Sequence, residues 1–331
     1  CACPGSPVSR SRTLLMMHLD ILIPTYRRPA LLARALESIA RARVPEGLTP
    51  GIIVVNNNSG DETPQVVEDF ARQAPLPVRC VTELKQGLSH ARNAGIAASS
   101  ADLIGMIDDD EEIAEDWLEV AERSFRGRPE LAFIGGPYHG NWSQDPPAWL
   151  PSSFRGVVGE VNLGPAVKPF TQGGADLLLG GNAVVRREWL ERAGPYNPAL
   201  GRSGANFASG EDLDMFDRLT ALGARGEYRP DLVIHHYIPP ERLTKRYFRR
   251  WAWGNGHSLG MLHRARPEPV PQIAGIPRYR IRVALEAGAR ALVRVHRRWT
   301  APGEAFAEEL RLREFGGFLA GRFRTPSTDH R

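Results

Sequence analysis

Short apolar segments alternate with amphipathic segments over the first 136 residues, and this alternation restricts the fold of the 331-residue chain most strongly. Four apolar runs have the length of buried strands: residues 19–25, 51–55, 78–82 and 103–107. Helical patterns with one apolar face follow them, at residues 30–43, 63–74, from 87 onward and 116–125. Strands that are linked through helices by short turns run in the same direction. We therefore predict an α/β fold with a mostly parallel sheet and helices on both faces.

The fourth predicted strand ends in the acidic run Asp108, Asp109, Asp110, Glu111 and Glu112. Closely packed carboxylates repel one another and destabilise a fold unless a cation or hydrogen-bond donors neutralise them. A divalent metal that holds a phosphorylated substrate is one such cation, because oxygen ligands suit Mg²⁺ and Mn²⁺. The alternative is a solvated acidic turn that opens the next helix, where the helix dipole favours acids. Glu111 and Glu112 are assigned to that following turn rather than to the site.

Polar and glycine-rich segments occupy the places where an open α/β sheet binds ligands. Residues 56–61 follow the second strand, at the end of the sheet that carries ligands in such folds. Residues 137–175 are rich in Gly, Pro and aromatic residues, and they predict a substrate-facing excursion whose rings stack on sugars or simply pack. The remaining expected elements are a returning strand at 177–185, a short helix at 188–193, a flexible loop at 201–210, a helix at 211–222 and a last strand at 232–236.

Charge is distributed unevenly along the chain. Residues 241–331 hold 19 basic and 8 acidic residues, whereas the rest of the chain holds 23 basic and 30 acidic residues. This basic C-terminal part of the chain is expected to be helical, from residue 240 onward, at 279–298 and at 307–323. We expect it to contact the anionic head groups of a membrane surface. The alternative is a solvated helix that packs on the rest of the protein through Val283, Leu285 and Leu292.

Further features of the sequence restrict the class of protein. No run approaches the ~20 apolar residues of a membrane span, and Cys1, Cys3 and Cys80 form neither a disulfide framework nor a zinc motif. Residues 1–17 have the composition of a disordered leader. The acidic body and the lack of a recognisable binding motif weigh against a nucleic-acid partner. We therefore predict a cytoplasmic protein that can lie peripherally at the inner face of the cytoplasmic membrane.

Six motifs occur in an order that resembles the family 2 glycosyltransferases over roughly residues 19–260. The motifs are Ile23-Pro24-Thr25-Tyr26-Arg27-Arg28-Pro29, Val54-Val55-Asn56-Asn57-Asn58-Ser59, Ala91-Arg92-Asn93-Ala94-Gly95, Ile107-Asp108-Asp109-Asp110, Gly180-Gly181-Asn182 and Gly210-Glu211-Asp212. The resemblance implies the GT-A fold, with a Rossmann-like nucleotide-binding sheet. It also implies inverting transfer of a sugar from a nucleotide sugar, usually a UDP-sugar, with Mg²⁺ or Mn²⁺.

The resemblance assigns a donor site residue by residue. Pro24, Thr25 and Tyr26 match the segment around the nucleoside, and Arg28 lies at its edge, within reach of a phosphate. Asn57 matches the position that contacts the base, which is often an Asp in the family. Because an amide both donates and accepts, thymine and guanine nucleotides stay open beside uracil. The other matching donor-site residues are Asp61, Arg92, Asn93, Asp108, Asp109, Gly181, Asn182, Arg250 and Trp251.

The resemblance also implies the metal site and the base. Asp110 of the Asp108-x-Asp110 motif is the expected direct ligand, and Asp108 contacts the ribose or a metal-bound water. His235 or His236 is a further metal or diphosphate contact, or an ordinary strand-end histidine. Asp212 matches the general base of the family. Glu211 is the alternative base, and both acids could instead cap their helix.

The expected organisation is a nucleotide-sugar-binding half at 18–136, an acceptor-binding and catalytic half at 137–260, and the basic extension at 261–331. The block at Arg249-Arg250-Trp251 lacks the full Gln-x-x-Arg-Trp pattern of processive synthases, so we expect transfer of single sugars. The acceptor is expected to be a saccharide or lipid-linked molecule in cell-envelope polysaccharide, lipopolysaccharide or glycolipid synthesis. The alternatives are a sugar-phosphate nucleotidyltransferase and a non-catalytic nucleic-acid- or sugar-binding protein. The acids at 108–110 and 211–212 argue against loss of activity.

Overall fold

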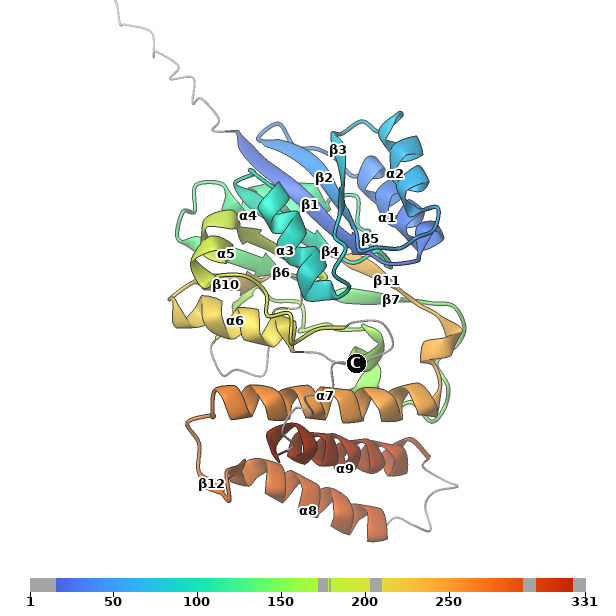
Figure 1. The fold of residues 1–331 in the computed structure, drawn as a ribbon, viewed down its shortest axis with the longest axis vertical. Helices are drawn as coiled ribbons and strands as arrows, with labels where there is room; N and C mark the ends of the chain where they lie inside the picture. The colour runs from blue at the N-terminus through green and yellow to red at the C-terminus, as the bar shows by residue number, and fades with distance from the viewer. Residues whose placement is uncertain (1–15, 172–177, 179, 203–209, 294–301, 324–331) are drawn as a thin grey trace, which may run out of the picture.

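The structure is a computed structural model that describes residues 16–171, 178, 180–202, 210–293 and 302–323. A twisted sheet with helices on both faces forms its upper part, and three stacked helices form a separate layer below (Figure 1). Five expected segments fall partly outside the described residues: the leader at 1–17, the excursion at 137–175, the strand at 177–185, the loop at 201–210 and the helix at 279–298. Within the described ranges, no helix combines the length and the apolar character needed to cross a membrane.

The main sheet confirms the predicted α/β fold. Within the described residues it has eight strands in the order β3-β2-β1-β4-β9-β6-β10-β8, of which only β8 and β9 run antiparallel to their neighbours. The strands are β1 (Met17–Thr25), β2 (Leu48–Asn56), β3 (Val78–Thr82), β4 (Leu103–Ile107), β6 (Leu131–Gly135), β8 (Lys168–Pro169), β9 (Asn182–Arg186) and β10 (Arg225–Tyr228). Because β2 and β3 lie on one side of β1 and β4 lies on the other, the strand order reverses between β1 and β4. Such a switch point is where open α/β sheets bind ligands.

Alternating strand residues bury the two faces of the sheet under two sets of helices. Ile21 and Ile23 of β1 share a core with α1 (Pro29–Arg41), α2 (Thr63–Ala71) and α4 (Trp117–Phe125). Leu22 points to the opposite face, in a core with α3 (Leu88–Ala98), α5 (Arg187–Ala193) and α6 (Glu211–Ala221). The central strands are thereby packed on both faces, which holds their carboxyl ends in place.

A second, three-stranded sheet lies below the carboxyl ends of the main sheet. In it β11 (Ile234–Ile238) pairs with β5 (Glu111–Ile113) and with β7 (Tyr138–Trp142). Two expectations are wrong: Glu111 opens a strand rather than belonging to a turn, and β11 is not the last strand. The excursion at 137–175 contains β7, β8 and the short helix η1 (Ser152–Val158). The hairpin of β12 (Gln272–Ile273) and β13 (Ile276–Pro277) follows β11.

The C-terminal extension folds into a helical layer of α7 (Lys245–Ala265), α8 (Arg278–Val293) and α9 (Pro302–Phe323), with α9 in the middle (Figure 1). Glycines let the backbones of α7 and α9 touch. A Cβ added to Gly256 would lie 2.0 Å from the carbonyl oxygen of Glu314, and one added to Gly321 would lie 2.0 Å from that of His257. The two helices therefore pack as one rigid pair.

The outermost helix, α8, corrects the expected packing of the extension. It buries Ala284 and Ala287, whereas the side chains of Leu285 and Leu292 are 70 % and 78 % exposed and Val283 is 39 % exposed. The expectation that Val283, Leu285 and Leu292 pack on the rest of the protein is therefore wrong. These apolar side chains face outward instead.

Candidate active site

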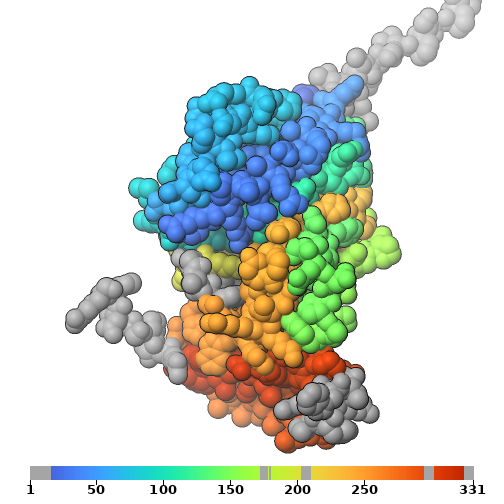
Figure 2. Space-filling view, turned by 90° about the vertical axis from the view of Figure 1, so that its right-hand side faces the viewer, coloured from blue at the N-terminus to red at the C-terminus, as the bar shows by residue number. Residues whose placement is uncertain are grey.

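A cavity of about 820 Å³ lies between the carboxyl ends of the central strands and α7. In Figure 2 the green β7 region and the orange segments after β11 lie side by side and join the blue sheet above to the red helices below. The turn after β1, the acidic run after β4, the start of α6 and one face of α7 all line this cavity. It brings together segments that are more than 100 residues apart, at the switch point of the sheet.

The acidic run forms a turn, and its side chains diverge. Asp109 is buried and accepts hydrogen bonds from the Thr25 hydroxyl (2.8 Å) and from Arg28 (3.0 Å). Asp108 is partly exposed to the cavity, and its Oδ1 has no hydrogen-bond partner among the described residues. Its backbone N–H donates to the buried carboxylate of Glu111, at 2.6 Å.

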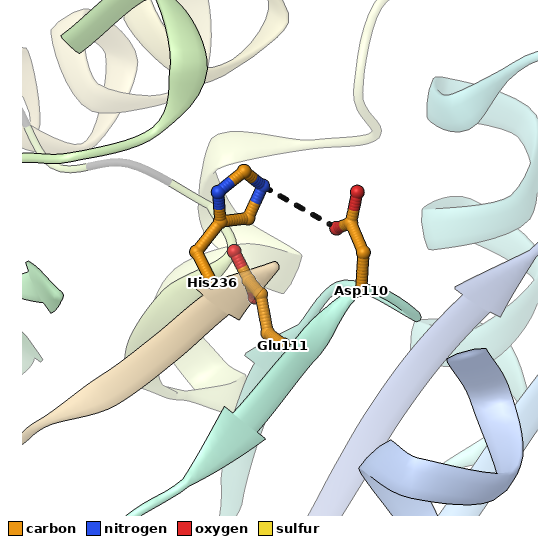
Figure 3. A group of neighbouring side chains, drawn as sticks. All are labelled: Asp110, Glu111 and His236. Atoms are coloured by element: carbon orange, nitrogen blue, oxygen red, sulfur yellow. Dashed lines mark ion pairs between the residues drawn. The ribbon is translucent and has the colours of Figure 1, made fainter. Parts of the chain in front are cut away.

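Asp110, Glu111 and His236 form a buried cluster (Figure 3). Each offers one ligand atom, and these atoms all lie within 4.8 Å of one another. Asp110 Oδ1 lies 3.6 Å from Nε2 of His236, and its Oδ2 accepts hydrogen bonds from Arg242 (2.7 Å) and Arg28 (3.1 Å). Two carboxylates and one imidazole suit Mn²⁺ and related divalent ions, so the residues fit the implied metal.

Burial raises the pKa of the acids in and beside this cluster, and neighbouring charges oppose that shift to different extents. Burial would raise the pKa of Asp110, but the guanidinium groups of Arg242 and Arg28, which both donate to its carboxylate, hold that pKa well below its usual range. Burial raises the pKa of Asp109 to about 7, although Arg28 opposes the shift. Burial, followed by the charges of Asp108 and Asp110, raises the pKa of Glu111 well above its ordinary value. A cation that binds here must displace protons from such groups.

Arg92 of α3 holds a second group of acids at the other side of the cavity. Its side chain is fully buried, donates a hydrogen bond to Asp212, and lies 3.6 Å from Asp108 and 3.8 Å from Glu211. The side chain of Asp212 is 20 % exposed and that of Glu211 is 9 % exposed. Burial and then Asp212 raise the pKa of Glu211 to about 7. One arginine thus links the acidic run to the two candidate bases.

The structure brings most of the predicted site residues to the cavity. Those that line it are Pro24, Thr25, Tyr26, Arg28, Asn57, Arg92, Asp108, Asp109, Asp110, Gly181, Glu211, Asp212, His236, Arg250 and Trp251. Asn57 lines it, but its amide donates to the carbonyls of Glu83 and Lys85 and accepts from the N–H of Gly87. Its polar atoms therefore position the segment at residues 83–87.

Four predicted residues lie outside the cavity lining. Asp61 accepts hydrogen bonds from Thr63 at the start of α2, and Asn93 bonds the backbone of Tyr196. Asn182 is buried and joins Trp117 to the carbonyls of Pro137 and Leu232. His235 is exposed on the face of β11 opposite His236, with its ring against His139. Their contacts hold the scaffold.

Sequence reasoning missed Glu111 of this buried cluster and Arg242, which contacts the cluster. Glu111 was assigned to a turn, but the turn falls at Asp109 and Asp110, and Glu111 then points inward at the start of β5. Arg242 gave no local signal, because it reaches Asp110 only after β11 and the Pro239–Pro240 turn return the chain to β5. A proline pair directly after a strand end was the available hint of a rigid turn there.

Comparison with solved structures identifies the fold as GT-A. Mannosyltransferase PcManGT from Pyrobaculum calidifontis, in complex with GDP-Man and Mn²⁺, aligns with a TM-score of 0.62 at 18 % identity, over 93 % of this chain and 88 % of its own. S. aureus TarS 1-349 in complex with UDP-GlcNAc aligns with a TM-score of 0.52 at 16 % identity, over 93 % of each chain.

Comparison of sequences then identifies the family. The sequence model described as Glycosyl transferase family 2 matches residues 20–194, and the chain belongs to that family. It is 28 % identical to the succinoglycan biosynthesis protein ExoM of Rhizobium meliloti over 74 % of this chain and 75 % of that protein. It is 25 % identical to the glucosyl-dolichyl phosphate glucuronosyltransferase of Haloferax volcanii over 67 % and 70 %. The protein is therefore a glycosyltransferase with relatives in polysaccharide and glycolipid synthesis.

Proposed function

We propose that this glycosyltransferase moves a single sugar, with inversion, from a nucleotide diphosphate-sugar to a hydroxyl group of its acceptor. The observation that carries the proposal is the cavity at the switch point, where buried carboxylates meet basic side chains of α7 such as Arg250. UDP-sugars are the first donors to test. The side-chain amide of Asn57 bonds the protein backbone, so we propose that the main chain around it recognises the base. Thymine and guanine nucleotides are therefore tested beside uracil nucleotides.

The proposed division of labour follows the chain. Residues 18–136 supply the donor side, with the turn at Pro24 to Arg28 beside the acidic run, and residues 137–260 supply the acceptor side and the base. Asp110, Glu111 and His236 would hold Mn²⁺ or Mg²⁺, with Asp108 at its edge. Such a cation supplies charge neutralisation for the leaving nucleoside diphosphate. Arg250 and Trp251 lie across the cavity, where a guanidinium can donate to phosphate oxygens.

Asp212 is the proposed general base. In an inverting transfer, the acceptor oxygen forms its bond to the anomeric carbon, the bond to the diphosphate breaks, and the hydroxyl proton passes to a carboxylate. The side chain of Asp212 is more exposed to the cavity than that of Glu211, and Arg92 fixes its orientation. Glu211, with its raised pKa, is the alternative base. Kinetic comparison of Asp212→Asn with Glu211→Gln tests this order.

The acceptor side of the proposal includes a membrane surface. The names of the two relatives refer to succinoglycan and to a dolichyl phosphate sugar, so a saccharide or lipid-linked acceptor in envelope synthesis is proposed here as well. The outward face of α8 presents Leu285 and Leu292 beside Arg282, whose side chain is 74 % exposed. Apolar side chains flanked by arginine suit the interface of an anionic bilayer. We place the protein peripherally at the cytoplasmic face.

A donor panel tests the proposed function. The purified chain is incubated with UDP-, TDP- and GDP-sugars, Mn²⁺ and saccharide or lipid-phosphate acceptors, and nucleoside diphosphate release is measured. Asp110→Ala should abolish the release, whereas His235→Ala, which changes an exposed residue one position from His236, should leave it near the wild-type rate. Pyrophosphate release from a nucleoside triphosphate and a sugar phosphate would instead support a nucleotidyltransferase. A wild-type chain that neither binds nor turns over any nucleotide sugar refutes the proposal.

A further inference from the structure

Arg242 contacts two members of the cluster that would hold the metal. Its Nη2 donates to Asp110 Oδ2 at 2.7 Å, and its Nη1 lies 3.1 Å from His236 Nε2. Arg242 is only 9 % exposed, and a three-residue helical turn, η2 (Pro240–Arg242), holds its backbone directly after β11. One guanidinium therefore bridges two of the three candidate metal ligands.

The chemistry of the guanidinium determines which atoms donate and which accept in this bridge. A guanidinium has N–H donors and no acceptor, so Nε2 of His236 must accept through its lone pair, with the ring proton on Nδ1. This tautomer leaves Nδ1 without a hydrogen-bond partner among the described residues. Nε2 is also the ring nitrogen that faces Asp110, at 3.6 Å from Oδ1 (Figure 3). A metal held between His236 Nε2 and Asp110 needs that same lone pair, so metal ligation and the Arg242 contact exclude each other.

Charge balance explains why an arginine lies there. Asp110 is 6 % exposed, and an unpaired carboxylate at that depth would be costly. Arg28 also reaches Asp110 Oδ2, at 3.1 Å, but it lies at the rim with a side chain that is 42 % exposed and makes no contact with His236. Arg28 can remain in place when a cation arrives, whereas Arg242 cannot keep its bond to the imidazole.

We propose that Arg242 is a positioning residue that exchanges partners. Without metal it substitutes for the cation between Asp110 and His236, and on metal binding it releases both and turns to the diphosphate of the donor in the same cavity. Arg242 lines that cavity together with Arg250, so the released guanidinium remains within the donor space. Its planar donors suit a diphosphate. The proposal rests on the proposed function for the identity of the donor, but its first half concerns the metal alone.

The test compares Arg242→Met with Arg28→Met, in both of which an arginine that contacts Asp110 is lost. Mn²⁺ binding is titrated by electron paramagnetic resonance without nucleotide. We expect Arg242→Met to bind Mn²⁺ about tenfold more tightly than the wild type, a coupling of ordinary size, and more tightly than Arg28→Met. With Mn²⁺ saturating, Arg242→Met should bind UDP about tenfold more weakly. The thermal midpoint of the metal-free Arg242→Met variant should fall and recover when Mn²⁺ is added.

Tighter binding of Mn²⁺ together with weaker binding of UDP by Arg242→Met is the signature of the exchange. Weaker or unchanged Mn²⁺ binding by Arg242→Met, equal gains for the two variants, or no Mn²⁺ binding by any of them would overturn the substitution of arginine for metal. An unchanged UDP affinity would overturn the turn toward the diphosphate. If Arg242→Met fails to fold, Arg242→Lys replaces it, because the lysine ammonium keeps the charge but does not bridge Asp110 and His236. The Arg242→Lys variant should still bind Mn²⁺ more tightly than the wild type. Because the Mn²⁺ titration contains no sugar donor, its result tests the exchange of arginine for metal even if the protein transfers no sugar.

Discussion

Arg92 is the residue whose replacement tests the electrostatic organisation of the site most directly. It is 1 % exposed, bonds Asp212, lies within 4 Å of Asp108 and Glu211, and packs on the ring of Tyr196. Arg92→Met keeps the length of the apolar stem and removes the charge. Three partly or fully buried carboxylates would then share a site without their common cation.

The expected cost follows from the burial. Removing one partner of a buried ion pair costs about 3–5 kcal/mol, because the other charge remains desolvated. Burial and Asp212 already raise the pKa of Glu211 to about 7, and burial raises that of Asp108 although Arg92 opposes it. Loss of Arg92 raises both further. A folded-state pKa above the unfolded value means that the folded protein binds more protons between the two values, so stability falls as pH rises through that window.

Urea unfolding in EDTA, followed by tryptophan fluorescence at about pH 5.5 and about pH 8, measures the loss of stability and its dependence on pH. We expect the loss for Arg92→Met to be larger at the higher pH. Arg43→Met is the control, because Arg43 is an exposed arginine that bonds Glu115 and Glu119 on the surface. A loss that is independent of pH, or one no larger than that of the control, would refute the reasoning that a buried cation holds these acids.

Three further outcomes are expected. His236→Ala should weaken Mn²⁺ binding by at least about tenfold, measured by calorimetry, whereas His235→Ala should not; equal losses would remove His236 from the ligand set. The thermal midpoint of the metal-free protein should fall between about pH 4.5 and pH 7 as Glu211 loses its proton, and Glu211→Gln should flatten that slope; an identical slope in the variant would assign the effect elsewhere. The double variant Leu285→Ser, Leu292→Ser should sediment less with anionic vesicles while donor hydrolysis in solution stays unchanged; undiminished sedimentation would exclude this face of α8 as the membrane contact.

The sequence revealed the parts of the fold that are coded by local patterns. Strands β1 to β4 are apolar runs bounded by turn residues, and their helices carry one apolar face, so periodicity was sufficient. Strand β10 was missed because Arg225–Tyr228 is short and polar, and only its pairing with β6 makes it a strand. Strand β9 begins at Asn182, several residues later than expected.

The candidate site likewise contains residues that the sequence predicted and residues that only the folded structure reveals. The family resemblance predicted Asp110, Asp212 and either His235 or His236, and the structure gathers Asp110, Asp212 and His236 around one cavity. The resemblance could not separate His235 from His236, because which of two neighbours faces inward depends on the pairing of β11 with β5. Nor could it find Arg242, whose contact with Asp110 spans 132 residues of sequence. Long-range pairing, rather than residue type, decides such positions.

The close packing of α7 on α9 has a mechanical consequence. One face of α7 carries Arg250 and Trp251 into the cavity, while its glycines lie against the backbone of α9, whose other side supports α8. Little compliance remains where the main chains of α7 and α9 touch. A displacement of α9 is therefore passed on to α7, which forms one wall of the cavity, rather than absorbed between the two helices. The helical layer thus couples the position of its outer helices to the space in which the substrates meet.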